Sequence, residues 1–301
     1  MTAGVVAEAP AKVNLRLRIL AREASGYHGL ESLFAAISLA DTVEVREGAP
    51  GIRLAVGGGV DTGPPDDNLV VRAARRFHRA LGTAPALDVA LTKRIPSAAG
   101  LGGGSSDAAA TLRALNALHG EPFGRAGLLR MAAELGSDVP FFLCGSTLAL
   151  GWGRGERLLA LPPLPSRPVL VAHPGIAMPT GDAFRRVAER RGAEGAPEAF
   201  AFGLDRLGGW SGVSSLAEND FEEVAFERVP VLAAAKEAMR AAGAEISLLA
   251  GSGASLFGVF PSTEARDQAG ARVGALGLAT WTAQTLESEP PLRVDPSRGI
   301  G

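Results

Sequence analysis

A glycine-rich segment at residues 100–104 constrains the fold of this chain more than any other feature of the sequence. Four of its five residues are glycine, and it separates a strand-like pattern from a helical one. A run of glycines is poor for stability alone, because each costs about 0.5–1 kcal/mol in ordered structure. Glycine does let the backbone approach a ligand closely, and a helix N-terminus behind it offers N–H groups and a positive dipole to an anion.

Physical arguments leave two interpretations of this segment open. It could be a loop that binds a phosphate group, or a flexible loop before a serine-capped helix. The Walker pattern needs a Gly-Lys pair, and none occurs in this chain. The dinucleotide fingerprint fails at its third glycine, which is Ser105 here, and the preceding strands do not form a βαβ unit. A nucleotide-binding loop of a different family fits better.

Composition places the chain among ordinary globular proteins. It has 301 residues, enough for about two domains of roughly 150 residues each. A formal net charge of −2 gives no global basic excess, so we expect no nucleic-acid partner. One cysteine and four histidines without ligand spacing argue against zinc. Cys144 lies in an apolar run, and we expect a buried, inert thiol.

The sequence shows no sign of a membrane segment. It contains no stretch of about 18 apolar residues, and residues 1–10 lack the basic and apolar regions of a signal peptide. We therefore expect a cytoplasmic protein with no membrane partner.

Hydrophobic periodicity predicts mixed α/β structure throughout. Strands are expected at residues 13–20, 33–38, 42–46, 52–56, 87–91, 139–144, 147–151, 169–173, 245–250, 256–260 and 279–285. Helices are expected after Asn68 and at residues 105–120, 124–135, 183–190, 231–242 and 263–276. Four prolines within residues 161–168 predict a boundary between domains. We expect the least regular structure at residues 191–215, and a disordered tail at residues 287–301.

Three segments resemble the three motifs of the GHMP kinases (galactokinase, homoserine, mevalonate and phosphomevalonate kinases). They are APAKVNL at residues 9–15, PSAAGLGGGSS at 96–106 and AGSGASLF at 250–257. Their order matches, and together they span nearly the whole chain. The resemblance implies an α/β (α+β) protein of two domains. Residues 1–161 would be an ATP-binding domain like domain 2 of ribosomal protein S5, and residues 162–286 a ferredoxin-like domain.

Within that family, four shorter segments narrow the resemblance. They are GYH at residues 26–28, GGGSSD at 102–107, GSDVPFF at 136–142 and HPG at 173–175. These resemble members that move the γ-phosphoryl group of ATP to the C2 hydroxyl of a methylerythritol linked to cytidine diphosphate, in the non-mevalonate isoprenoid pathway. The resemblance implies ATP as co-substrate, Mg²⁺, and a small-molecule acceptor that carries cytidine diphosphate.

Two alternatives stay open. One is a GHMP kinase for another small alcohol, such as homoserine or a mevalonate derivative. The other is a non-catalytic nucleotide-binding or RNA-binding module like ribosomal protein S5. The sequence leaves open whether the chain is a monomer or a homodimer.

The resemblance also assigns roles at the acceptor side. Asp138 would be the base that accepts the proton of the acceptor hydroxyl, with Lys12 beside it. Asn14 lies on the same strand face as Lys12, so it could orient the same hydroxyl. The cytidine would stack between Tyr27 and Phe184. The other implied acceptor contacts are His28 and Thr180.

The nucleotide side is assigned in the same way. The implied ATP-binding residues are Pro96, Ala98, Gly100, Leu101, Gly102, Gly103, Gly104, Ser105, Ser106, Asn68 and Lys93. The implied loop that closes over the transferred phosphate comprises Gly251, Ser252 and Gly253. The ligands of Mg²⁺ stay unknown, although Ser106 or Asp107 could supply an oxygen. From the residues alone, a helix cap remains a good interpretation of Asn68, and a surface lysine remains a good interpretation of Lys93.

Overall fold

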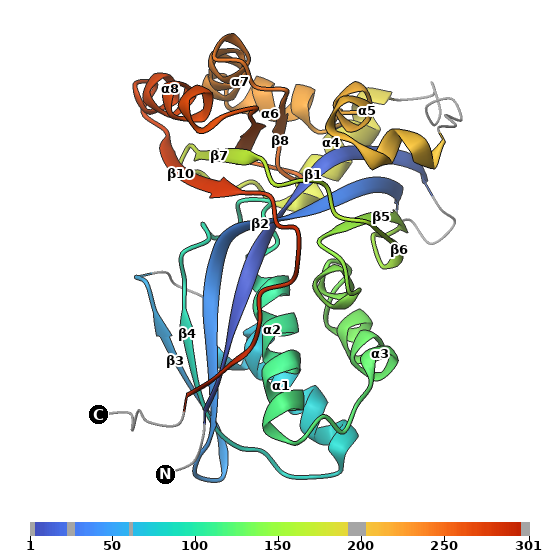
Figure 1. Cartoon of the computed structure of the whole chain (residues 1–301), viewed down its shortest axis with the longest axis vertical. Helices are drawn as coiled ribbons and strands as arrows, with labels where there is room; N and C mark the ends of the chain where they lie inside the picture. Colours follow the sequence, from blue (N-terminus) through green and yellow to red (C-terminus); the bar gives the residue numbers. More distant parts are fainter. Residues whose placement is uncertain (1–3, 23–27, 60–62, 192–202, 296–301) are drawn as a thin grey trace.

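The computed structural model describes residues 4–22, 28–59, 63–191 and 203–295, which form two β-sheets covered by helices (Figure 1). The first sheet has the strand order β11-β1-β2-β4-β3, with β5 paired to β2 and β6 paired to β5. Its strands are β1 (Gly4–Arg22), β2 (His28–Glu47), β3 (Gly51–Gly57), β4 (Ala86–Thr92), β5 (Leu148–Gly153), β6 (Arg157–Leu161) and β11 (Arg293–Asp295). All neighbouring pairs are antiparallel except β3 and β4.

Three helices pack beside the first sheet (Figure 1). They are α1 (Leu69–Leu81), α2 (Gly103–Leu118) and α3 (Arg125–Leu135), with the short 3-10 helices η1 (Pro65–Asp67) and η2 (Val139–Leu143) between the larger elements. The predicted helix after Asn68 is confirmed. The Asn68 side chain caps α1 by accepting a 2.9 Å hydrogen bond from the amide of Val70, and Gly82 ends the helix in the left-handed conformation.

The second sheet has the strand order β10-β7-β9-β8, and every neighbouring pair is antiparallel. Its strands are β7 (Pro168–His173), β8 (Ile246–Leu249), β9 (Leu256–Val259) and β10 (Ala279–Gln284). The helices of this part are α4 (Thr180–Arg191), η4 (Leu204–Gly208), α5 (Trp210–Ser215), α6 (Glu222–Arg228), α7 (Val231–Ala241) and α8 (Thr263–Gly274). The chain passes from one sheet to the other at the predicted proline-rich boundary, between Leu161 and Pro168.

The long strands β1 and β2 run from the first sheet up to the second part (Figure 1). Isolated bridges join Leu17 to Asn219 and Ile37 to Thr285, and one apolar core contains residues of both parts. The prediction of two strands at 33–38 and 42–46 is therefore wrong, since β2 is continuous. Asp41 lies within this continuous strand, is fully buried, and accepts hydrogen bonds from the amides of Arg94 and Ile95.

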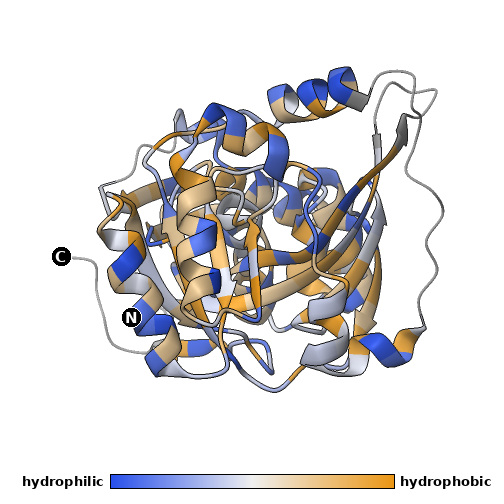
Figure 2. Ribbon diagram, turned by 90° about the horizontal axis from the view of Figure 1, so that it is seen from above, coloured by the Kyte–Doolittle hydropathy of each residue, from blue (hydrophilic) through white to orange (hydrophobic). Residues whose placement is uncertain are grey.

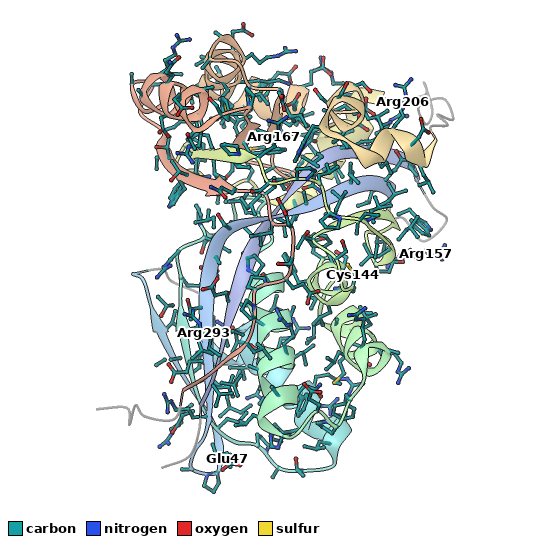
Figure 3. All side chains as sticks on the ribbon, viewed as in Figure 1. Glu47, Cys144, Arg157, Arg167, Arg206 and Arg293 are labelled. Atoms are coloured by element: carbon teal, nitrogen blue, oxygen red, sulfur yellow. The ribbon has the colours of Figure 1, made fainter. Side chains whose placement is uncertain are left out.

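Two further predictions of local structure are wrong. Residues 139–143 form the 3-10 helix η2 instead of a strand, because Pro140 removes a backbone donor and a short apolar run does not distinguish buried strand from buried helix. Cys144, labelled in Figure 3, follows η2 and is half-buried where a buried thiol was expected, and burial is the main cause that raises the pKa of its thiol. Of the segment 191–215, which we expected to hold the least regular structure, residues 192–202 lie outside the described residues, and the prediction is wrong for residues 210–215, which form α5.

The tail expected to be disordered from residue 287 is ordered as far as residue 295. It returns to the first sheet, where Arg293 of β11 lies beside β1 and forms a 3.0 Å ion pair with Glu8 (Figure 3). Arg113 of α2 donates a 2.8 Å hydrogen bond to the carbonyl of Pro290. The sequence signal failed here because three prolines and few apolar residues do not reveal backbone pairing with a distant strand. The last residues, 296–301, lie outside the described residues.

Removing residues 287–301 should lower the melting temperature by several degrees. The truncation deletes β11 and the bond from Arg113, each hydrogen bond being worth about 1 kcal/mol, and 1 kcal/mol shifts Tm by roughly 2–4 °C in a chain of this size. The matched control is a chain that ends at residue 295 and keeps these contacts. Thermal unfolding followed by circular dichroism measures both. Equal Tm values for the two truncations would contradict the stabilising role of the tail.

Apolar residues concentrate in the central strands and in the helix faces that cover them (Figure 2). Among the described residues, no helix has both the length and the apolar character needed to cross a membrane. The cytoplasmic location stays a prediction.

Candidate active site

Lys12 and Asn14 form a buried polar pair on one face of β1. They are two residues apart, so their side chains leave the strand on the same side. The ammonium of Lys12 donates a 2.9 Å hydrogen bond to Oδ1 of Asn14, and Nδ2 of Asn14 donates a 2.7 Å bond to the hydroxyl of Ser32 on β2. Only 4% of Lys12 and 2% of Asn14 is exposed. The bonds to each other and to Ser32 therefore fix both polar heads.

Asp138 stands at the other side of Lys12. It follows α3 and precedes η2, and its Oδ2 atom lies 3.4 Å from the Lys12 ammonium. The Asp138 side chain is 30% exposed, whereas that of Lys12 is 5% exposed. The ammonium also lies 5.5 Å above the ring of Phe34. This arrangement presents a carboxylate to solvent with a fixed positive charge behind it, as a base beside a developing oxyanion requires.

The glycine loop approaches this pair through its backbone. The carbonyl of Leu101 accepts a 2.9 Å hydrogen bond from the Lys12 amide. Gly102 has a φ of 71°, and a Cβ there would lie 3.0 Å from Cγ of Lys12. Gly102 is also the N-cap of α2, so the serine cap of the alternative interpretation is absent. The loop thus places the N-terminus of α2 next to Lys12 without a side chain in between.

The second glycine cluster packs directly against the first. The Gly251 amide donates a 3.1 Å hydrogen bond to Oδ1 of Asn14, and the Ser255 amide donates a 3.3 Å bond to the carbonyl of Ala99. A Cβ on Gly251 would lie 2.9 Å from the carbonyl oxygen of Gly100. The segment 250–253 therefore contacts both β1 and the phosphate-loop candidate, although its closing over a phosphate stays a prediction.

An open cleft of ≈ 1090 Å³ runs between these elements. It is lined by several predicted site residues from both halves of the chain, among them Lys12, Asn14, Asp138, Gly100, Thr180 and Phe184. The hydroxyls of Thr180 and Ser252 lie 3.0 Å apart, and Phe184 packs edge-on against Phe221 with ring centroids 4.9 Å apart. Of the other predicted acceptor contacts, Tyr27 and the side chain of His28 lie outside the described residues.

The cleft also contains residues that sequence reasoning missed. Arg154 and Glu156 line it from the turn between β5 and β6, and Arg157 lines it from the start of β6 (Arg157 is labelled in Figure 3). The basic residues around Gly153 and Gly155 are a weak signal that could have suggested an anion-binding turn. Ser32 does not line the cleft but holds Asn14 by a hydrogen bond. No pattern in the sequence indicated this role, because it depends on the pairing of β2 with β1.

Several residues predicted to contact ATP do not line this cleft. The Asn68 side chain caps α1, and Pro96 and Ala98 belong to the loop before α2, where Ala98 has a φ of 52°. Ser106 is fully buried and lines a small, partly open cavity of ≈ 20 Å³. Contacts of these residues with ATP stay predictions.

Lys93 is not a surface lysine. Its side chain is 6% exposed, and its ammonium pairs with Asp41 and, at 2.6 Å, with Asp107 of α2. The alternative of a solvated lysine is therefore wrong. The ion pair also accounts for the acidic Asp107 near the N-terminus of α2, since Lys93 supplies a compensating charge. Contact of Lys93 with ATP stays a prediction.

A preformed magnesium site does not fit these residues. Within the part of the chain that the structure describes, no group of three or more His, Cys, Asp or Glu side chains could hold a metal ion. Neither candidate residue lines the cleft, since Ser106 borders a separate small cavity and Asp107 is held by Lys93. Mg²⁺ typically keeps several waters and binds substrate phosphates with only one or two protein ligands.

Replacing Asp107 by Asn should remove a pH-dependent cost of folding. Burial is the main cause that raises the pKa of Asp107 from 3.8 to about 7, against the opposing charge of Lys93. Between these values the folded protein keeps a proton that the unfolded chain has released, so the free energy of unfolding falls as the pH rises.

The free energy of unfolding of Asp107→Asn, measured relative to that of the original chain, should therefore increase by about 2–4 kcal/mol as the pH rises from 4 to 7. Urea unfolding of both proteins at intervals across this range measures the difference. A difference that stays constant with pH would contradict the raised pKa.

The comparisons with known proteins agree with this geometry. Residues 68–146 match the family model of the GHMP kinases N terminal domain, and residues 204–277 match that of the GHMP kinases C terminal. A protein of Anaeromyxobacter dehalogenans named 4-diphosphocytidyl-2-C-methyl-D-erythritol kinase is 42% identical, over 98% of this chain and 94% of its own. The chain belongs to the GHMP kinases. The predicted mixed α/β fold of that family and the enzymatic nature of the chain are confirmed, and ATP is the family's co-substrate.

Three more proteins are similar to this chain. A protein of Solibacter usitatus with the same name is 42% identical, over 83% of this chain and 79% of its own. A crystal structure of 4-(cytidine 5'-diphospho)-2C-methyl-D-erythritol kinase superposes with a TM-score of 0.77 at 35% identity, covering 93% of this chain and 98% of its own. A homoserine kinase from Cytophaga hutchinsonii, at 22% identity and a TM-score of 0.72, shares the fold. The match covers 98% of this chain and 97% of that kinase.

Proposed function

We propose that this chain transfers the γ-phosphoryl group of ATP to the C2 hydroxyl of 4-diphosphocytidyl-2-C-methyl-D-erythritol. The products would be ADP and the 2-phosphate, in the non-mevalonate route to isoprenoid precursors. The observation that carries the proposal is the Asp138–Lys12 pair, 3.4 Å apart in a cleft that also contains the glycine loop. The proteins of that name at 42% identity, one of them matched over 98% of this chain, support the choice of acceptor.

The proposed reaction uses the polar groups around Asp138. Asp138 accepts the proton of the acceptor hydroxyl as its oxygen attacks the γ-phosphorus, and the bond to the β-phosphate oxygen breaks to release ADP. Lys12 offsets the negative charge that develops on the attacking oxygen. Asn14 holds Lys12 through the 2.9 Å hydrogen bond, and the N-terminus of α2 receives the phosphate oxygens.

Mg²⁺ would arrive on the phosphates of ATP and supply positive charge there. No described cluster offers it a ready set of protein ligands.

We place the acceptor's cytidine diphosphate on the side of the cleft that contains Thr180 and Phe184. Tyr27 and Phe184 are the proposed stacking partners of the cytosine, with His28 at its edge and Thr180 nearby. Leu30 pairs with Gly153, so the β5–β6 turn is held beside the start of β2.

Among the described residues that line the cleft, Arg154 of that turn and Arg157 at the start of β6 carry guanidinium groups that could meet a diphosphate. Homoserine and mevalonate contain no diphosphate, so these charges favour the cytidine-linked acceptor.

An assay of ADP formation coupled to a reporter enzyme tests the proposal with three acceptors. We expect kcat/KM for the cytidine-linked alcohol to exceed the values for homoserine and mevalonate by at least about 10²-fold, because a site built for a base and a diphosphate leaves its polar groups unpaired with smaller substrates. Asp138→Asn serves as the control for contaminating kinases. Faster turnover of homoserine or mevalonate would refute the proposed acceptor while leaving the family assignment intact.

A further inference from the structure

Three charged side chains meet behind the glycine loop and outside the cleft. Asp41 comes from β2, Lys93 follows β4, and Asp107 lies in the second turn of α2. Their side chains are 0%, 6% and 4% exposed, so together they form a buried ion-pair cluster with one cation between two carboxylates. Removing such a cation leaves two buried carboxylates uncompensated, which is strongly unfavourable.

The cluster fixes the segment that leads into the glycine loop. Oδ1 of Asp41 accepts hydrogen bonds from the amides of Arg94, at 2.5 Å, and Ile95, at 2.9 Å. Its Oδ2 atom accepts a bond from the ammonium of Lys93. Asp41 therefore binds three consecutive residues and determines how the chain leaves the sheet.

The same cluster reaches the N-terminus of α2. A Cβ on Gly103 would lie 3.2 Å from Cγ2 of Ile95 and 3.4 Å from the Lys93 ammonium, so the first residue of the helix packs against both. Lys93 then donates to Oδ2 of Asp107, one turn further along. The helix terminus that is proposed to bind phosphate is thus held to β2 through Lys93.

We propose that Lys93 is a positioning residue, which ties the N-terminus of α2 to Asp41 and so holds the glycine loop in its phosphate-binding geometry. The inference rests on the proposed binding of ATP at that loop. It replaces a direct contact between the Lys93 ammonium and ATP, because that ammonium is buried, is bound to two carboxylates and does not line the cleft.

Electrostatics agree with this role. Asp107 lies close to the proposed phosphate site, and with a pKa of about 7 it is partly ionised at neutral pH, where an unpaired carboxylate would repel the nucleotide. Burial lowers the pKa of Lys93, but Asp107 and Asp41 outweigh it and raise the pKa overall. Lys93 is therefore charged at neutral pH and screens Asp107.

A double-mutant cycle of Lys93→Met and Asp107→Asn distinguishes positioning from direct contact. The readouts are Kd for a non-hydrolysable ATP analogue by calorimetry, and KM for each substrate. We expect Lys93→Met to weaken ATP binding by about tenfold or more and Asp107→Asn by roughly threefold, with little change in KM for the acceptor. In the Lys93→Met background the second substitution should cause no further loss, because the tether is already broken.

Equal effects of Asp107→Asn in both backgrounds would overturn the inference, as would unchanged ATP binding by Lys93→Met. Lys236→Met is the matched control, since it breaks another partly buried ion pair, with Glu222, outside the cleft. It should leave Kd for the analogue within about twofold. If Lys93→Met does not fold, the double variant removes one of the uncompensated carboxylates. An ATP affinity of the double variant equal to that of the original chain would then overturn the inference.

Failure of the proposed function is visible separately. If the unsubstituted chain binds the ATP analogue but does not phosphorylate the cytidine-linked alcohol, the proposed acceptor is refuted. The double-mutant cycle still measures the effect of Lys93 on ATP binding.

Discussion

Asp138→Asn should lower kcat by about 10²–10⁴-fold, with KM for both substrates changed by less than about threefold. The amide has nearly the shape of the carboxylate, so the substrates still bind in the cleft. It cannot take the proton of the acceptor hydroxyl, which is the role assigned to the carboxylate 3.4 Å from Lys12. Steady-state kinetics with saturating ATP and cytidine-linked acceptor measure the effect.

The control for this substitution is Glu134→Gln. Glu134 also loses its charge near the end of α3, but it pairs with Arg76 at the surface and does not line the cleft. Its kcat should stay within about twofold of that of the original chain. A decrease in kcat of less than tenfold for Asp138→Asn would show that another group, or water, accepts the proton.

Local signals in the sequence predicted the parts of the site that depend on backbone shape. The glycines at 100–104 and 251–253 identified two turns whose conformations and close approach need the absence of a Cβ, and the structure brings them into contact. Lys12 and Asn14 were placed on one strand face by their spacing, and their hydrogen bond agrees with that inference. Asp138 and its pairing with Lys12 needed the family resemblance, because an aspartate in a turn is common.

Long-range pairing was beyond these signals. Asp41 lies 52 residues before Lys93, and only the antiparallel pairing of β2 with β4 brings the two together. The return of residues 293–295 to β1 likewise depends on a strand at the other end of the chain. The error at residues 139–144 has a different origin, since an apolar run shows burial but not the backbone conformation in which it is buried.

Gly100→Ala should reduce kcat/KM for ATP by about 10²-fold, because it displaces the glycine loop from the segment that follows β8. Gly100 has a φ of 78°, and a Cβ there would collide with the carbonyl oxygen of Ala250. The methyl group and that carbonyl cannot both keep their places, so the two loops must separate. A displacement near 1 Å of groups that hold a reacting phosphate is enough for a loss of this size.

Gly120→Ala isolates the contact from the backbone strain. Gly120 has a φ of 74°, close to that of Gly100, but a Cβ there would meet nothing within 4 Å. Both substitutions therefore carry the cost of a left-handed alanine, about 1–2 kcal/mol of stability, and only Gly100→Ala moves the loops. Gly120→Ala should keep kcat/KM for ATP within about twofold. Equal kinetic effects of the two variants, measured at a temperature where both are folded, would show that contact between the glycine loops is not needed for ATP to bind and react.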